Sequence, residues 1–430
     1  MPTKPQKNDG YTVIARPEHN VSRANVSENA LKVLYRLKNA GFESYLVGGG
    51  VRDILLGREP KDFDIATDAT PEEVKGLFRN CRLIGRRFRL AHVHFSGDII
   101  EVATFRGQHE GDQGDEGQIV DGMIVRDNVY GDLHDDAWRR DFSVNSLYYN
   151  IKDFSILDYV GGLDDLRAKR LRLIGDPEQR YREDPVRMLR AVRFAAKLDF
   201  SIDAESESPL FELGELLEGV PPARLFEEFL KLFLSGHAKE SYRLLQHYGL
   251  FRCLFPQTQG KLTETDCETF HLLIQQALSN TDDRIAEGKS VTPAFLLAVF
   301  LWGPVQDLRE RYKERGMSEQ QALTAAMDAV LSGQSRRISI PRRFQIPIKE
   351  IWNLQGRLEH RAPKRSLKLL THPRFRAAYD FLLLRSIAGG VEQELADWWT
   401  RFQIADEEEA EELLASFKRN QRKPRRRRRR

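Results

Sequence analysis

The sequence predicts an α+β protein with a mixed α/β head and an all-helical remainder. Within the first 165 residues, short apolar runs typical of strands alternate with helical patterns and glycine turns. From Arg182 onward, apolar residues recur at helical spacing, and proline, glycine and polar stretches separate the helices. At 430 residues the chain is long enough for two or more domains.

Local patterns predict the elements of the head in order. Apolar residues at helical spacing predict a helix over 28–40, which Gly41 ends. The further elements expected are a strand at 44–47, a short helix at 51–56, a strand carrying Asp62 and Asp64, a helix from Thr70, and a hairpin of strands at 89–95 and 99–105. Residues 1–28 are polar and expected to be loosely ordered, and 110–122 are rich in Gly, Asp and Gln and predict a mobile loop.

The helical remainder is expected to contain helices at 185–198, 223–234 and 239–248, then further helices through residue 400. No clear internal repeat is visible. The longest apolar run covers nine residues, 294–302, which is too short to cross a bilayer, so no transmembrane segment is expected.

Composition favours a cytoplasmic protein. Charged residues make up 30% of the chain, and the mean hydropathy is −0.51. The first residues lack the apolar core of a signal peptide. Only Cys81, Cys253 and Cys267 occur, without paired spacing, so neither a disulfide framework nor a zinc site is expected.

The C-terminal charge is strongly polarised. Residues 418–430 carry ten cations and no anion, ending in six arginines, so the net charge of +3 leaves −7 for the rest. An acidic block at 406–412 precedes this tail. Segments with such charge do not fold alone, so the acidic block and the tail are both expected to be disordered. The tail is interpreted as an arm that binds polyanions, since arginines release counterions from nucleic acid phosphates.

A glycine-rich turn and two aspartates predict chemistry on phosphates. Gly48-Gly49-Gly50 would let backbone N–H groups approach a triphosphate, and Arg52 adds a cation. Asp62 and Asp64 would share one face of a strand, with Phe63 pointing into a core. Paired carboxylates of this kind suit Mg²⁺. Neither a P-loop nor a dinucleotide fingerprint fits these glycines.

Three further segments are candidates for the site. Glu101 is either a third carboxylate at the metals or a surface carboxylate paired with Arg106. After Arg139 and Arg140, which lie on different helix faces, Asp141 would orient an arginine or support the metal site. Asp184 is expected to cap a helix that begins at Pro185 and carries an arginine ridge able to contact a nucleobase: Arg187, Arg190 and Arg193.

A basic segment before the second hairpin strand is expected to approach single-stranded nucleic acid. Arg86, Arg87 and Arg89 surround Phe88, which combines phosphate contacts with a stacking surface. His92 and His94 share a strand face nearby and are interpreted as structural residues, because no third His or Cys accompanies them.

The motifs resemble those of class II nucleotidyltransferases, the family of bacterial poly(A) polymerases and CCA-adding tRNA nucleotidyltransferases. The resemblance covers residues 30–250 and rests on Gly48–Asp53, Asp62–Asp64, Arg139–Phe142 and Glu183–Arg187. Residues 86–93 and the arginine-rich end are similar to the poly(A) polymerase branch. The resemblance implies a polymerase-β-like head followed by an all-α neck, body and tail. The domains expected are an N-terminal extension (1–28), the head (29–165), the neck with base recognition (166–250), a helical RNA-binding body (251–403) and the tail (404–430).

The same resemblance implies roles for individual residues. Two Mg²⁺ ions, for which Mn²⁺ substitutes, would be held by Asp62 and Asp64, with Asp141 as a further catalytic aspartate. The residues implied around the ATP substrate are Gly48, Gly49 and Arg52 at the triphosphate, and Arg140, Asp184, Arg187 and Arg190 around the base and sugar.

The implied activity is template-independent polyadenylation of RNA 3′ ends with release of pyrophosphate, which marks RNA for decay. RNA-decay machinery or an RNA chaperone is the expected protein partner. Two alternatives stay open: a CCA-adding enzyme, which shares the catalytic residues, and a catalytically silent RNA-binding protein, against which the intact aspartates argue.

Overall fold

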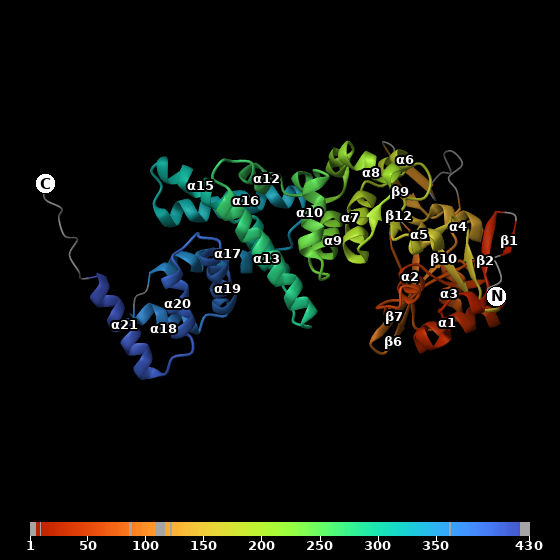
Figure 1. Ribbon diagram of the computed structural model, residues 1–430, viewed down its shortest axis with the longest axis horizontal. Helices are drawn as coiled ribbons and strands as arrows, with labels where there is room; N and C mark the ends of the chain where they lie inside the picture. The colour runs from red at the N-terminus through yellow and green to blue at the C-terminus, as the bar shows by residue number, and fades with distance from the viewer. Residues whose placement is uncertain are drawn as a thin grey trace. The chain divides into compact units, whose positions relative to one another are not determined.

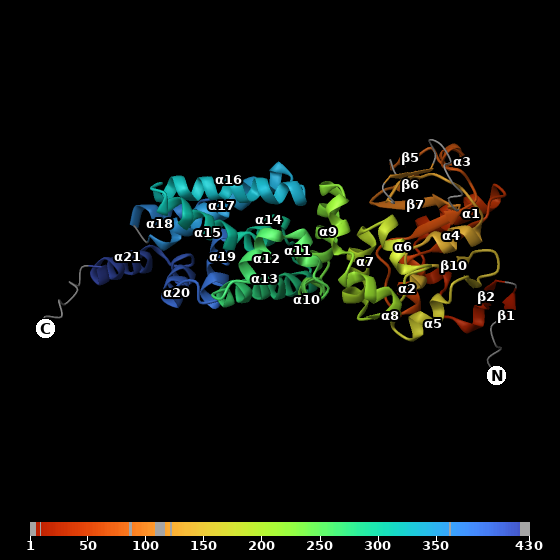
Figure 2. The same ribbon diagram turned by 90° about the horizontal axis from the view of Figure 1, so that it is seen from above.

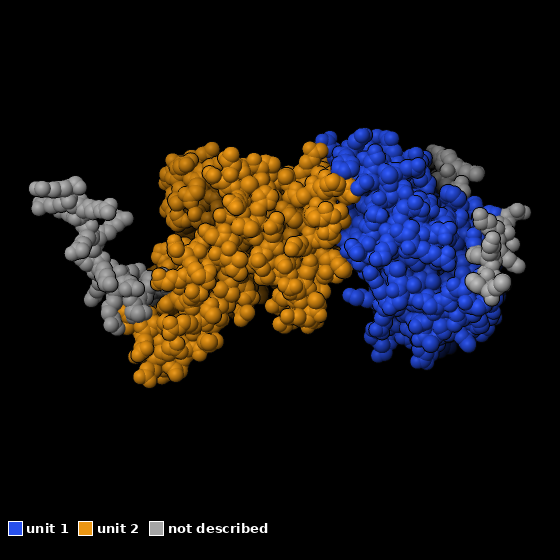
Figure 3. Space-filling model, in the orientation of Figure 1, with its two compact units in different colours: residues 1–216 blue, residues 217–430 orange. Residues whose placement is uncertain are grey.

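The computed structural model describes residues 6–8, 10–85, 88–107, 117–120, 123–360 and 363–421. The chain divides into two compact units, Met1–Leu216 and Leu217–Arg430 (Figure 3). The first unit contains the sheet, and the second is helical throughout its described residues (Figure 1). The expected fold class is therefore confirmed.

A nine-stranded sheet forms the centre of the first unit. In spatial order its strands are β1 (Gln6–Asn8), β2 (Tyr11–Ile14), β11 (Ile156–Asp158), β10 (Leu147–Asn150), β3 (Ser44–Val47), β4 (Asp64–Thr67), β7 (Asp98–Thr104), β6 (Leu90–Phe95) and β5 (Cys81–Ile84). Neighbouring strands are antiparallel, except that β4 and β7 are parallel. The predicted hairpin of β6 and β7 and the predicted strand at 44–47 are confirmed.

Helices cover both faces of this sheet. Those of the first unit are α1 (Glu28–Asn39), α2 (Gly49–Leu55), α3 (Pro71–Leu77), α4 (Leu133–Arg139), α5 (Gly162–Arg167), α6 (Pro177–Glu183), α7 (Val186–Leu198) and α8 (Ala204–Glu207). Leu133 and Ala137 of α4 pack on Tyr45, Val47 and Ala66 of the central strands. Helices α1 and α3 contact strand β7 (Figure 2) and lie on the other side of the sheet from α4 (Figure 1). Two smaller sheets pair β8 (Gly117–Val120) with β9 (Met123–Asp127), and β12 (Arg170–Leu171) with β13 (Ser201–Ile202).

Two expectations for flexible segments are corrected. The N-terminal extension was expected to be loosely ordered, but its strand β2 pairs with β11 in the main sheet. Ile14, Val21 and Val26 are buried, so a few apolar residues attach this polar segment to the core. Within the loop expected at 110–122, residues 117–120 form β8, which pairs with β9, and the remaining residues of that loop lie outside the described part.

Element boundaries near the glycine turn also differ from expectation. Helix α2 begins at Gly49, so two of the three glycines are helical. Strand β4 begins at Asp64, and Asp62 precedes it. The physical reason is that the partner strand β3 ends at Val47, directly opposite Asp64, which leaves Asp62 and Phe63 without a ladder partner. Phe63 is half-buried rather than a core residue.

The second unit is built from helices. They are α9 (Pro222–Phe233), α10 (Ala238–His247), α11 (Leu250–Leu254), α12 (Pro256–Leu262), α13 (Glu268–Ala286), α14 (Pro293–Phe300), α15 (Trp302–Glu314), α16 (Glu319–Arg337), α17 (Arg342–Glu359), α18 (Pro363–Leu370), α19 (Phe375–Ile387), α20 (Gln393–Phe402) and α21 (Glu407–Gln421). The expected helices at 223–234 and 239–248 are confirmed to within one residue. Among the described residues, no helix combines the length and apolar character needed to cross a membrane.

The acidic block at 406–412 was expected to be disordered, and this is wrong. Residues 407–421 form helix α21, because Ala410, Leu413 and Leu414 recur at helical spacing and bury against Trp398 and neighbouring residues. Glu407, Glu408, Glu411 and Glu412 take exposed positions of the helix, and Glu409 is half-buried. The arginines from 422 onward lie outside the described residues.

Candidate active site

The turn after β3 brings backbone close to the predicted carboxylates. Gly48 has a φ of +75°, a conformation that residues with a side chain rarely adopt. A Cβ atom at Gly48 would lie 3.2 Å from Asp64 Oδ2 and 4.0 Å from Arg140 Nη1. At Gly50, the corresponding atom would lie 3.3 Å from the Asp62 carbonyl oxygen. The glycines are therefore required by the close approach of the turn to Asp62, Asp64 and Arg140.

Carboxylates converge at the start of β4. Asp64 is in register with Glu101 on the parallel neighbour β7, so both side chains project from the same face of the sheet. Burial raises the pKa of Asp64 to about 6, with Glu101 and Asp62 adding to the rise and Arg140 and Arg190 opposing it. Glu101 and Asp62 thus lie close enough to Asp64 to repel it, although both of them are exposed.

Glu101 is not paired with Arg106, which rules out one of the two expectations for it. The Glu101 carboxylate lies 3.3 Å from His92 Nε2 on the neighbouring strand β6. Arg106 instead contacts Asp136. The expectation that Glu101 joins the aspartates is supported by the strand register, and His92 packs beside it from the same face.

Arg140 follows directly after helix α4 and faces the glycine turn. Its Nε and Nη2 atoms contact Oδ2 of the buried Asp136 at 3.1 and 2.9 Å, and Nε also donates to the Tyr148 hydroxyl at 2.7 Å. The structure therefore places Arg140 beside Gly48 and Asp64. This position is at the glycine turn, whereas the resemblance implied a contact with the base and sugar.

Asp141 is held in an ion pair with Arg190 of helix α7. Arg190 Nε donates to Asp141 Oδ2 at 2.7 Å, and the other carboxylate oxygen accepts from the Phe142 amide at 2.8 Å. Burial alone would raise the pKa of Asp141, but Arg190 outweighs this effect and holds it well below its usual range. Of the two expectations for Asp141, the geometry favours the one in which it orients an arginine.

Arg52 lies in the interior of the unit, with an exposed fraction of 2%. Its guanidinium donates to Asp53 at 2.7 and 2.8 Å and to Asn145 at 2.6 Å, and it lies 5.3 Å from the ring centre of Phe194 on α7. The contact with Asn145 attaches α2 to the segment 143–145, and the contact with Phe194 attaches it to α7. The expected contact of Arg52 with a triphosphate stays a prediction.

The residues expected to recognise a base lie around the start of α7. The helix begins at Val186, one residue later than expected, and Asp184 Oδ1 accepts from the Val186 amide at 3.3 Å. Arg187 is buried and donates to the Arg180 carbonyl at 2.6 Å and to Glu183 at 3.1 Å. Arg190 therefore connects this helix to Asp141, while Asp184 and Arg187 organise its first turn.

The basic segment around Phe88 was expected to approach single-stranded nucleic acid. Arg86 and Arg87 lie outside the described residues. Arg89 is paired with Glu72 at 2.7 Å, and Phe88 lies 5.5 Å from the Arg106 guanidinium. The role in RNA binding expected for this segment stays a prediction.

Sequence reasoning missed three residues of the site: Asp136, Asn145 and Tyr148. The spacing of Asp136 and Arg140 is that of an i,i+4 helix pair, a signal that was available. Asn145 joins Arg52 to Asp141, and its contact with Arg52 spans 93 positions in the sequence, for which no local pattern exists.

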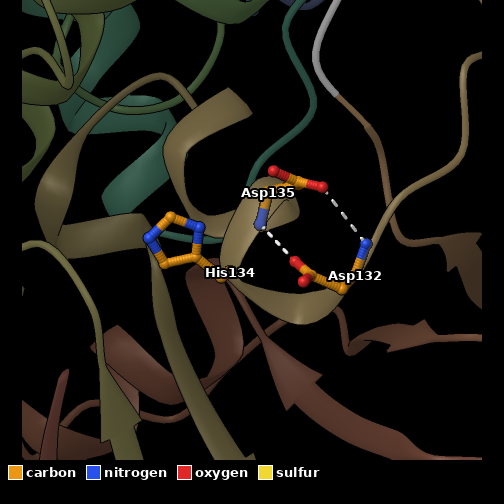
Figure 4. Close-up of side chains that lie close together, drawn as sticks. All are labelled: Asp132, His134 and Asp135. Carbon is orange, nitrogen blue, oxygen red and sulfur yellow. Dashed lines mark hydrogen bonds between the residues drawn. The ribbon is translucent and has the colours of Figure 1, made fainter. Parts of the chain in front are cut away.

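A second group of possible metal ligands lies at the start of α4: Asp132, His134 and Asp135 (Figure 4). Asp132 Oδ1 accepts from the Asp135 amide at 2.8 Å, and Asp135 Oδ2 accepts from the Asp132 amide at 3.4 Å. This reciprocal pair is a helix capping box, which accounts for the two carboxylates without a cation.

The fold and the carboxylate site together define a nucleotidyltransferase, and comparison with known proteins identifies the family. Residues 44–172 match the model described as "Poly A polymerase head domain". Residues 199–262 match "Probable RNA and SrmB- binding site of polymerase A", and residues 315–430 match "Polymerase A arginine-rich C-terminus".

Sequence comparison over nearly the whole chain identifies the same family. Poly(A) polymerase I of Salmonella typhimurium is 51% identical over 94% of this chain and 88% of its own length. Poly(A) polymerase I of Haemophilus influenzae is 47% identical over 96% and 92%. The chain therefore belongs to the poly(A) polymerase I family.

CCA-adding enzymes are more distant relatives. The enzyme of Lactobacillus helveticus is 38% identical over 50% of this chain and 52% of its own length. The solved structure of the Bacillus stearothermophilus CCA-adding enzyme in complex with CTP matches with a TM-score of 0.57 at 24% identity, covering 90% of this chain and 82% of that one. This level of identity shows a shared fold.

Proposed function

We propose that this chain adds adenylate residues from ATP to RNA 3′ ends without a template, releases pyrophosphate, and thereby marks RNA for decay in the cytoplasm. One observation carries the proposal. The carboxylate pair Asp64 and Glu101 lies beside the Gly48 turn in a chain that is 51% identical to poly(A) polymerase I over nearly its whole length.

The chemistry of the carboxylates fits a divalent cation. Asp64 has a raised pKa because of burial and like-charged neighbours, and a cation would relieve that repulsion. The donors are oxygen atoms, which suit Mg²⁺, with Mn²⁺ as a substitute. We assign two ions to Asp62 and Asp64, with Glu101 as an additional ligand. When bound, such ions acidify the RNA 3′-hydroxyl and neutralise charge on the departing pyrophosphate.

The protein's own groups orient the substrates in this proposal. Backbone amides around Gly48 and Gly49 contact the triphosphate, as does Arg140, whose guanidinium faces the turn. Arg52, which also contacts its neighbour Asp53, attaches helix α2 to Asn145. The base and sugar are assigned to Asp184, Arg187 and Arg190, and Asp141 holds Arg190 in place. The neck and body, 166–250 and 251–403, would bind RNA, and RNA-decay machinery or an RNA chaperone would be recruited.

Nucleotide addition to two RNAs tests the proposal against CCA addition. An unstructured oligonucleotide and a tRNA lacking its terminal CCA are each offered ATP, CTP or both, with Mg²⁺. We expect long tails from ATP alone on the unstructured RNA. Addition that stops after two C and one A on the tRNA would identify the CCA-adding alternative instead.

The Asp64→Asn variant tests the remaining alternative, a silent RNA-binding protein. Removing one carboxylate charge from the proposed metal site should abolish nucleotide addition while RNA binding stays intact, measured by tail length and by fluorescence anisotropy with labelled RNA. Asp164→Asn is the matched control, because Asp164 is exposed and, within the described part of the chain, forms an ion pair with Arg167 alone, at 3.4 Å. Retained polymerisation in Asp64→Asn would overturn the metal assignment.

A further inference from the structure

A buried network lies behind Arg140, away from the glycine turn. Its centre is Asp136, which has an exposed fraction of 1%. Oδ1 of Asp136 accepts from the Arg106 amide at 3.2 Å and from Arg106 Nε at 3.3 Å, while Oδ2 accepts from Arg140 and Tyr148. Both carboxylate oxygens are therefore used inside the protein, and Asp136 acts on its neighbours rather than on a ligand.

Tyr148 closes this network from strand β10. Its hydroxyl donates to Asp136 Oδ2 at 2.7 Å and accepts from Arg140 Nε at 2.7 Å. The ring is fully buried, and its centre lies 5.1 Å from the Arg140 guanidinium carbon. A side chain with two torsions fixed in a packed core holds its hydroxyl in one place, so Tyr148 limits rotation of the guanidinium.

The network leaves one edge of Arg140 open. Nε and Nη2 are engaged by Asp136 and Tyr148, whereas Nη1 has no hydrogen-bond partner in the described part of the chain. The side chain is only 15% exposed, and Nη1 is the atom that approaches the Cβ position of Gly48. Two N–H donors of a nearly buried cation therefore face the glycine turn.

A role in fold stability alone explains the network of Asp136, Tyr148 and Arg140 less well than a role in binding. Removing charged groups from water costs free energy of desolvation, and the attraction between the buried charges often does no more than offset that cost. Buried ion pairs therefore stabilise a fold less than apolar packing does. A structural pair would also be expected to satisfy all the donors of its arginine. Here the unsatisfied donors lie on the side of the turn.

We propose that Asp136 and Tyr148 are positioning residues that fix Arg140 so that its Nη1 edge donates hydrogen bonds to phosphate oxygens held at the Gly48 turn. This inference rests on the proposed function for the identity of the phosphate as the triphosphate of a nucleotide. A guanidinium held in one orientation loses less entropy when it binds an oxyanion, and charge-assisted hydrogen bonds to phosphate are strong.

The Tyr148→Phe variant of the full chain tests the inference, with Tyr149→Phe as the matched control. Tyr149 is the next residue of β10, is equally buried, and its hydroxyl has no hydrogen-bond partner among the residues that the structure describes. Binding of inorganic tripolyphosphate and of adenosine is measured by isothermal titration calorimetry, and KM and kcat for ATP are measured in parallel. We expect Tyr148→Phe to weaken tripolyphosphate binding roughly five- to tenfold and to raise KM for ATP similarly, as for a lost charge-assisted contact. Adenosine binding should be unchanged.

Two results would overturn the inference. One is that Tyr148→Phe and Tyr149→Phe have tripolyphosphate affinities and KM values within twofold of each other. The other is an equal loss of adenosine and tripolyphosphate binding, which would indicate general loosening of the site. Arg140→Lys keeps the charge but lacks the planar guanidinium that Asp136 and Tyr148 hold. It should therefore weaken tripolyphosphate binding and raise KM for ATP as Tyr148→Phe does.

Failure of the proposed function gives a different pattern. If the wild-type chain adds no adenylate to RNA but binds tripolyphosphate in a Tyr148-dependent manner, the anion site stands and the assigned reaction is wrong. If it polymerises adenylate and Tyr148→Phe matches its control, the reaction stands and the positioning role is wrong.

Discussion

Asp64 is the residue at which the glycine turn, the neighbouring strand and the other carboxylates meet. Its position at the first residue of β4 fixes its side chain on the face shared with Glu101, and burial of Asp64, followed by repulsion from Glu101, disfavours its ionised form. The folded chain therefore holds a carboxylate whose ionised form is unfavourable unless a cation is bound. A cost of this kind in the metal-free protein is typical of functional sites.

The stability of the metal-free protein should reveal this cost. The folded-state pKa of Asp64, about 6, lies above the ordinary value of 3.8, so its stabilising contribution is full below pH 3.8 and is lost as the pH rises through 6. At pH 8 with a chelator, Asp64→Asn should be more stable than wild type by about 1 to 3 kcal/mol, since the amide resembles the neutral acid. The difference should shrink as the pH is lowered from 6 toward 4.

Urea unfolding across this pH range measures the effect. Asp164→Asn is the control, because Asp164 is exposed, so that water screens its charge, and it is not one of the carboxylates that raise the pKa of Asp64. A stability difference between Asp64→Asn and wild type that does not change with pH would contradict the assigned cause.

At the same scale, the residues proposed to bind the metal and the phosphates could be recognised in the sequence more readily than the residues that support them. The glycines and aspartates form short motifs whose chemistry is readable from residue type and spacing. Asn145 and Tyr148 have no such signal, because their importance depends on Arg52 and Arg140, which the fold brings to them. For Glu101 the sequence left two interpretations, a carboxylate at the metal site and a partner of Arg106. The pairing of β4 with β7 favours the first of them.

The elements of the chain were predictable where apolar periodicity was strong. Helix α1 buries Ala30, Val33, Leu34 and Leu37, the residues from which it was predicted. Helix α21 was missed because its acidic residues dominate its composition, whereas its apolar stripe has three buried members among the residues whose burial is described, 407–415. Strand β2 was missed because a four-residue strand gains its stability from pairing with β11, a partner distant in sequence.

Helix α21 should be held in place by its apolar stripe. Leu413 is 7% exposed in a cluster with Trp398, Trp399 and Phe402, and its carbonyl accepts from Trp398 Nε1 at 3.3 Å. Leu413→Ala leaves that carbonyl in place but removes buried methyl groups, and it should destabilise docking of the helix by about 2 to 4 kcal/mol.

Hydrogen exchange of the amides of residues 407–415 measures this change. The control is Glu411→Ala, an exposed substitution on the same helix that is expected to preserve protection. Equal protection of both variants would indicate that the helix is stable without its contacts to the cluster.

The whole molecule combines a head that carries a group of carboxylates beside the Gly48 turn with a strongly basic C-terminal sequence. Its general architecture and family were predictable, because the motifs occur in order along the chain and the helical pattern persists beyond them. Domain limits were less accessible to sequence reasoning. The first compact unit ends at Leu216, which lies inside the range 166–250 that was expected to form one neck. Strand β12 at 170–171 pairs with β13 at 201–202, so the first part of that range belongs to the first unit.

The arginine-rich end should contribute to RNA affinity through charge rather than through nucleotide choice. Removing residues 422–430 deletes eight cations while keeping helix α21, whose last residue is Gln421. The plot of log affinity for single-stranded RNA against log salt should become less steep, by up to about 0.7 for each cation that contacts a phosphate. A chain in which the same eight cations are replaced by glutamine is the matched control for length, and it should behave like the truncation. The preference for ATP over CTP should be unchanged in both, because base selection is assigned to the neck. A salt dependence identical to that of the wild-type chain would show that RNA phosphates are contacted elsewhere.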